Sequence, residues 1–184
     1  MSRTPPSFHL QIVVNGKTRR GEPYGEARRK ILNLDAGREA MAAVSSWPGY
    51  RPTPLVDLQG TAAELGVRQV LCKDESQRFG LKSFKALGGA YAVSRLLRRI
   101  VSERLGREVT AADIAARRFE DITGGVTVTC ATDGNHGRSV AWGARTFGCR
   151  CVIFIHSLVS DARAAAIAAL GARVERTAGN YDDA

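Results

Sequence analysis

The stretch VTVTCATDGNHGRSVAWGARTFGCRCVIFIH, residues 126–156, decides the fold. Its first part, Val126–Ala131, alternates and is rich in β-branched side chains, which predicts a strand. A tight loop at Gly134–Gly137 follows, then a helix over Arg138–Phe147, and then an apolar strand at Cys151–Ile155. A strand, a helix and a strand in this order are typical of a parallel sheet with helices packed on it.

The pattern continues toward the C-terminus. Asp161–Leu170 is rich in alanine and predicts a helix, with Ser160 as its N-cap and Gly171 just after its end. A further strand is expected at Arg173–Arg176. The order β-α-β-α-β predicts an α/β fold with a parallel sheet and packed helices. Such sheets bind ligands at the carboxyl ends of their strands, which is where Asp133–Gly137 lies.

The N-terminal half is less regular. Residues 25–45 and Leu55–Leu65 predict helices, and Val67–Lys73 predicts a strand. Trp47–Pro54 is expected to be irregular, because three prolines within seven residues remove backbone donors and restrict the residues before them. A longer helix is expected at Ser83–Arg99, where two adjacent glycines would let another segment approach closely.

Composition limits the possible classes of protein. The 184 residues are 44% hydrophobic and 24% charged, as in a globular protein, and no apolar run approaches the roughly 20 residues of a membrane span. No secretory signal is recognisable, so a cytoplasmic protein without a membrane partner is expected. Cys72, Cys130, Cys149 and Cys151 form no C-x-x-C pair, and we expect reduced cysteines and no metal site.

The formal net charge is +9, and seven arginines lie between Arg95 and Arg118. Glu103, Glu108 and Asp113 are interspersed among them. This mixture of charges favours a solvated helix face. Aromatic side chains are not interleaved with the arginines, as they are in proteins that bind single-stranded nucleic acid. No nucleic-acid partner is therefore predicted.

Two groups of residues are candidates for chemistry. Lys85 is flanked by apolar side chains and a glycine pair, and an amine partly withdrawn from water suits Schiff-base chemistry; the alternative is a solvated surface lysine. The second group, at 132–137, leads into a helix N-terminus, whose free N–H groups favour an anion, and its glycines would let a ligand approach. The alternatives here are a capping role for Asp133, a turn role for Asn135 and a packed side chain for His136.

Four segments resemble, in order, motifs of the fold-type II (tryptophan synthase β-like) pyridoxal-phosphate enzymes: YRPTPL at 50–55, KDES at 73–76, SFK at 83–85 and GNHG at 134–137. Within that group, SWPGYRPTPL, KDESQRFGLKSFKALGG and ATDGNHGRSVAWGA resemble the diaminopropionate ammonia-lyases most. Serine and threonine dehydratases typically have a serine-containing loop where this chain has Asp133.

The resemblance implies α,β-elimination of 2,3-diaminopropionate to pyruvate and ammonia with pyridoxal 5'-phosphate as cofactor. Lys85 would bind the cofactor covalently, and Asn135 would contact its phenolic oxygen. The backbone of Gly134, Asn135 and His136 would hold the substrate carboxylate. Asp133 would act as general acid–base at Cα or at the departing β-amine, because ammonia leaves badly unless it is protonated. The partner would be a small amino-acid substrate, and the assembly a homodimer.

The resemblance also implies a division of the chain. Residues 1–85 would contribute to the large cofactor domain, and residues 86–184 would form a small βαβ domain. In relatives a glycine-rich phosphate loop and a second acidic residue lie further along, so we expect the N-terminal part of a longer enzyme, inactive alone. The alternatives are a serine/threonine dehydratase-like lyase and a non-catalytic truncated fragment.

Overall fold

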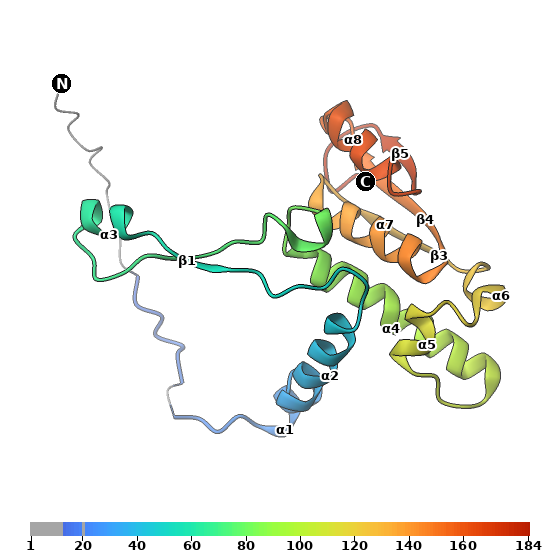
Figure 1. The fold of residues 1–184 in the computed structure, drawn as a ribbon, viewed down its shortest axis with the longest axis horizontal. Coiled ribbons are helices and arrows are strands. Elements are labelled where there is room, and N and C mark those ends of the chain that lie inside the picture. Colours follow the sequence, from blue (N-terminus) through green and yellow to red (C-terminus); the bar gives the residue numbers. More distant parts are fainter. Residues whose placement is uncertain (1–12, 20) are drawn as a thin grey trace.

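The structure is a computed structural model that describes residues 13–19 and 21–184. In chain order its elements are α1 (Glu26–Ile31), α2 (Leu34–Ser45), β1 (Leu55–Asp57), α3 (Gln59–Leu65), β2 (Leu71–Lys73), a 3₁₀ turn (Arg78–Gly80), α4 (Lys85–Leu105), α5 (Ala111–Ala115), α6 (Glu120–Thr123), β3 (Thr127–Ala131), α7 (Asn135–Phe147), β4 (Arg150–His156), α8 (Asp161–Ala168) and β5 (Arg173–Thr177). Figure 1 shows α4 running through the body, with the sheet and α7 on one side and α2 on the other.

The three C-terminal strands form a parallel sheet in the order β3-β4-β5. Val128 lies beside Cys151, and Ile153 lies beside Val174. Helix α7 connects β3 to β4, and α8 connects β4 to β5. The predicted β-α-β-α-β order is confirmed. The carboxyl ends of β3 and β4 are neighbours at one edge of the sheet, where the 132–137 segment begins.

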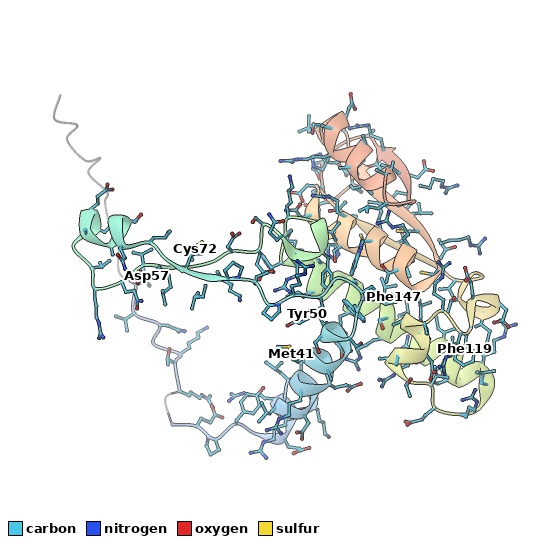
Figure 2. The ribbon with its side chains drawn as sticks, viewed as in Figure 1. Met41, Tyr50, Asp57, Cys72, Phe119 and Phe147 are labelled. Carbon is cyan, nitrogen blue, oxygen red and sulfur yellow. The ribbon has the colours of Figure 1, made fainter. Side chains whose placement is uncertain are left out.

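Helix α7 packs against α4 at very short range, which fixes the ends of both helices relative to each other. A Cβ on Gly89 would lie 2.3 Å from Ser139 Oγ, and one on Gly143 would lie 2.8 Å from Ala90 Cα. The close approach expected at the glycine pair is confirmed at Gly89, where the approaching segment is α7, but not at Gly88, which has open space around it. Phe147, fully buried, lies in the core where these helices meet (Figure 2).

Three segments differ from the sequence-based expectation. The strand expected at Val67–Lys73 is shorter, because only Leu71–Lys73 pair with β1. The segment Leu55–Leu65 is not one helix: it begins as strand β1, because Leu55–Asp57 pair antiparallel with Leu71–Lys73 of β2. The expected helix over 25–45 is interrupted, since the Asn33 side chain accepts a hydrogen bond from Ala36 N and caps α2.

Strands β1 and β2, joined by α3, extend away from the body as an arm that carries Asp57 and Cys72 (Figures 1 and 2). The domain division at residue 85 stays a prediction. Among the described residues, no helix combines the length and apolarity that crossing a membrane requires.

Candidate active site

A cavity of about 410 Å³ lies where the start of α4 meets the starts of α7 and α8. It is lined by Lys85, Asp133, Gly134, Asn135, Arg138, Ala162, Arg163 and Ala166. The structure therefore brings Lys85 together with Asp133 and Asn135, although about 50 residues separate them in the chain.

The start of α7 is organised by Thr132, whose fully buried side chain follows β3. Its Oγ1 accepts hydrogen bonds from Gly134 N and Gly137 N, both at 3.0 Å. A Cβ on Gly137 would lie 2.3 Å from Thr132 Cγ2, so this glycine allows the helix to pack on the strand end rather than a ligand to approach. The expected tight loop is also shorter than predicted, because α7 already begins at Asn135.

The backbone donors at this helix start are fewer than predicted. Gly134 N–H is already bonded to Thr132, so it is not free for a substrate carboxylate. Asn135 N–H and His136 N–H have no acceptor among the described residues. The His136 side chain is exposed and does not line the cavity, so the alternative of a packed histidine is wrong.

Lys85 is the first residue of α4, and Ser139 of α7 fixes its backbone. The fully buried Ser139 hydroxyl donates to Lys85 O at 2.6 Å and accepts from Ala90 N at 3.2 Å. Lys85 itself is exposed, and the side chain of Phe84 beside it is 63% exposed. The expectation that apolar neighbours withdraw this amine from water is therefore wrong for this structure. What distinguishes Lys85 from an ordinary surface lysine is its position in the lining of the cavity.

The YRPTPL and KDES segments are joined by a buried ionic network. Glu75 accepts from Arg78 Nε at 2.7 Å and from Thr53 Oγ1 at 2.5 Å, while Lys73 Nζ donates to Thr53 O at 2.5 Å. The Arg78 guanidinium lowers the pKa of the Glu75 carboxyl from 4.5 to about 2. This network anchors the segment that leads into Lys85.

Sequence inspection missed two cationic residues of the cavity, Arg138 and Arg163. Arg138 lies one turn after Asn135 on α7, and Arg163 lies in the first turn of α8, where its Nη1 is 3.4 Å from Asp133 O. Both could have been found, because helices that follow neighbouring parallel strands begin at the same sheet edge.

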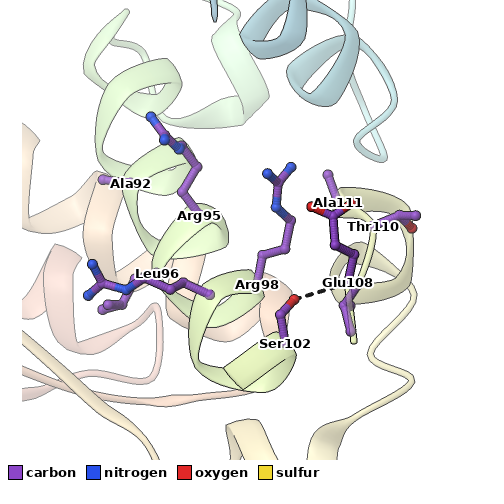
Figure 3. Close-up of a pocket in the computed structure, with 10 residues that line it drawn as sticks. Ala92, Arg95, Leu96, Arg98, Ser102, Glu108, Thr110 and Ala111 are labelled. Atoms are coloured by element: carbon purple, nitrogen blue, oxygen red, sulfur yellow. Dashed lines mark hydrogen bonds between the residues drawn. The ribbon is translucent and has the colours of Figure 1, made fainter. Parts of the chain in front are cut away.

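A second and larger cavity, of about 710 Å³, lies between α4 and the start of α5 (Figure 3). Arg95, Arg98 and Arg99 line it. Arg98 pairs with Glu39 at 2.7 Å, and Arg99 lies 4.0 Å from Glu103. Such pairing is what the solvated-face interpretation of this basic region predicts.

Comparisons with known proteins identify the family of this chain. Residues 46–184 match the pyridoxal-phosphate dependent enzyme family. Diaminopropionate ammonia-lyase of Escherichia coli (strain K12) is 44% identical over 139 residues, which cover 73% of this chain and 33% of that protein. The diaminopropionate ammonia-lyase of Salmonella typhimurium (strain LT2) is 39% identical over 181 residues, covering 96% of this chain and 44% of that protein.

A crystal structure of the Escherichia coli enzyme, in complex with an aminoacrylate-PLP azomethine reaction intermediate, superposes with a TM-score of 0.67 at 37% identity. The match covers 82% of this chain and 36% of that one. The match thus spans 33% of the length of the Escherichia coli protein and 44% of the length of the Salmonella typhimurium protein. Since the family match takes in most of its residues, the chain belongs to the pyridoxal-phosphate dependent enzymes.

Proposed function

We propose that this protein serves the α,β-elimination of 2,3-diaminopropionate, in which one water is consumed and one pyruvate and two ammonia molecules are released. The observation that carries the proposal is the cavity in which Lys85 faces Asp133 and Asn135, in a chain 39–44% identical to diaminopropionate ammonia-lyases. The substrate is a small amino acid.

The residues of the cavity fit pyridoxal 5'-phosphate. Lys85 offers a primary amine at the cavity wall for the aldehyde group, and the cations Lys85, Arg138 and Arg163 suit an anionic ligand. When bound, the cofactor supplies an electron sink that stabilises negative charge at Cα. Asn135 would hold the phenolic oxygen of the ring through its side-chain amide.

The chain's own residues would position the substrate and move its protons. Asn135 N–H and His136 N–H, which have no acceptor among the described residues, would hold the carboxylate at the α7 start. Within the part of the chain that the structure describes, Asp133 is the one carboxylate that lines the cavity, and it would protonate the departing β-amine or take the proton from Cα. A serine at this position could not supply the proton as well, which favours an amine over a hydroxyl leaving group.

The test of the lysine is chemical. Pyridoxal 5'-phosphate is added to the protein, the adduct is reduced with borohydride, and the labelled peptide is identified by mass spectrometry. We expect the label on Lys85 and its loss in Lys85→Ala, whereas Lys30→Ala, a change at an exposed lysine of α1, keeps it. A label on Lys17 or Lys30 instead would contradict the assignment.

The test of Asp133 is kinetic. In Asp133→Asn of a complete enzyme that contains this chain, kcat for diaminopropionate should fall about 10²- to 10⁴-fold with little change in cofactor affinity, because a general acid–base group is removed. Serine and threonine serve as comparison substrates, and Asp133→Ser should shift the preference toward serine. Equal turnover of diaminopropionate by wild type and Asp133→Asn would refute the role.

A homodimeric assembly, which rests on the resemblance alone, and a cytoplasmic location are further parts of the proposal. Light scattering after size-exclusion chromatography tests the first, and cell fractionation tests the second.

A further inference from the structure

The backbone of Lys85 is held on both sides by serine hydroxyls. Lys85 N–H donates to Ser83 Oγ at 3.2 Å, and Ser139 Oγ donates to Lys85 O at 2.6 Å. The first of these bonds is exposed, so water can replace it, whereas Ser139 is fully buried. Ser139 Oγ also accepts from Ala90 N at 3.2 Å, so a single hydroxyl of α7 spans the first turn of α4.

Water cannot take the place of the Ser139 hydroxyl in this contact. A Cβ on Gly89 would lie 2.3 Å from Ser139 Oγ and 2.8 Å from Ser139 Cβ, which shows how closely the two helices approach there. Removing one oxygen atom from so close a contact leaves a gap too small for a water molecule. The hydrogen bond to Lys85 O would therefore be lost without replacement.

The position of this hydroxyl distinguishes it from the rest of the contact between α4 and α7. Further along the two helices, Gly143 faces Ala90 and Val93, and these groups pack through apolar atoms. The Ser139 hydroxyl instead lies against Lys85, the residue of α4 that lines the cavity. A buried polar group is thus placed where the orientation of one residue matters most.

We propose that Ser139 is a positioning residue for Lys85, an assignment that rests on the proposed function. Lys85 is exposed, so packing confines its side chain little. The backbone sets the direction of its Cα–Cβ bond, and the hydrogen bond from Ser139 holds that backbone. Ser139 thereby keeps the amine directed at the cavity, where a displacement of about an ångström would disturb a reacting group.

The test compares Lys85 with a second lysine in the same molecule. The 184-residue chain is treated with a limiting amount of pyridoxal 5'-phosphate, reduced with borohydride and analysed by mass spectrometry. Lys30, exposed on α1, is the internal reference. In Ser139→Ala the ratio of label at Lys85 to label at Lys30 should fall about 10-fold, which is the effect of losing one or two intramolecular hydrogen bonds.

A spectroscopic measurement separates positioning from a merely structural role. The circular dichroism of the cofactor chromophore, measured before reduction and expressed per mole bound at Lys85, should also fall in Ser139→Ala. A chromophore held in one orientation gives a signal that a loosely held chromophore does not. Ser139→Cys is the second variant: it fills the site with a weaker donor and should lower both quantities by a smaller factor.

Two control variants are matched to Ser139→Ala. Ser94→Ala removes a hydroxyl from another buried serine, which lies on α4 away from Lys85. Val93→Ala takes methyl groups from the contact of α4 with α7 and should lower the unfolding midpoint, but it leaves the Ser139 hydroxyl in place. Both controls should keep the labelling ratio and the circular dichroism of the wild type when all variants are measured well below their unfolding midpoints.

Each remaining outcome counts against a stated part of the reasoning. An unchanged labelling ratio or an unchanged circular dichroism in the Ser139 variants would overturn the assignment. An equal fall in Val93→Ala would overturn it as well, because any weakening of the helix contact would then displace Lys85. A wild-type chain labelled at Lys30 but not at Lys85 would contradict the proposed function itself and leave Ser139 no reactive lysine to position.

Discussion

Replacing Glu75 by glutamine should lower the free energy of unfolding by about 3 kcal/mol. Glu75 accepts two hydrogen bonds from the Arg78 guanidinium, at 2.7 and 3.0 Å, and a third from Thr53. The Arg78 side chain is 6% exposed and that of Glu75 is 16% exposed. The variant leaves a buried cation without its counter-charge, and breaking such a pair typically costs about 3–5 kcal/mol. The lower end applies because Arg78 still donates to Arg51 O.

The pH dependence gives an independent check on the same pair. The pKa of Glu75 is lowered from 4.5 to about 2 in the folded protein, so its contribution is complete above pH 4.5 and is lost as the pH falls toward 2. A fall of this size corresponds to about 3 kcal/mol before screening by solvent. The difference in stability between wild type and Glu75→Gln should therefore shrink as the pH falls from 4.5 to 2.

Urea unfolding followed by tryptophan fluorescence measures this effect, because Trp47 and Trp142 lie within 6.0 Å of each other in the adjoining aromatic cluster. Glu64→Gln is the matched control: the residue is exposed on α3, and the change should stay within about 0.5 kcal/mol. A loss below about 1 kcal/mol in Glu75→Gln at pH 7, or a loss that does not depend on pH, would refute the reasoning.

Two further predictions concern small side chains and thiols. Gly89→Ala should destabilise the protein by about 1–3 kcal/mol, because the new methyl group would meet Ser139 Oγ at 2.3 Å. Gly88→Ala is the control and should cost little free energy, because Gly88 has open space around it. Equal unfolding midpoints for the two variants would contradict this prediction. Cys72 is exposed on β2 and should react with iodoacetamide at pH 8 in the native protein. Burial raises the pKa of Cys151 to about 12, so this thiol should react only after unfolding. Rapid labelling of Cys151 in the native protein, seen by peptide mapping, would show that β4 is not buried as described.

The C-terminal half of the fold could be predicted because its signals are local. Alternating strands, glycines after helices and an alanine-rich helix predict β3 to β5 and the helices between them, with bounds that differ by one to three residues. The N-terminal half was less predictable. The leucines after Pro54 suit a helix by propensity, but pairing with β2 outweighs it. That pairing depends on residues 14 to 18 positions further along, which no local pattern contains.

Three members of the candidate site were predicted from the sequence, but their environment was not. Motif order identified Lys85, Asp133 and Asn135, and all three line one cavity. The exposure of Lys85 agrees with the alternative of a solvated surface lysine. Flanking apolar residues on a helix point in different directions and do not cover their neighbour. The loss of Gly134 N–H to Thr132 is equally invisible in the sequence, because it depends on the backbone geometry at the start of α7.

The geometry of the site depends on residues that touch no ligand. Lys85 comes from α4 and Asn135 from α7, so their separation is set by the contact between these helices. That contact is as short as it is because Gly89 faces Ser139 and Gly143 faces Ala90. Changes at these positions would therefore move the lysine relative to the helix start without altering any group that reacts. We expect such variants to lose function with the cavity residues intact, because a displacement of Lys85 by about an ångström is enough to disturb a positioned catalytic group.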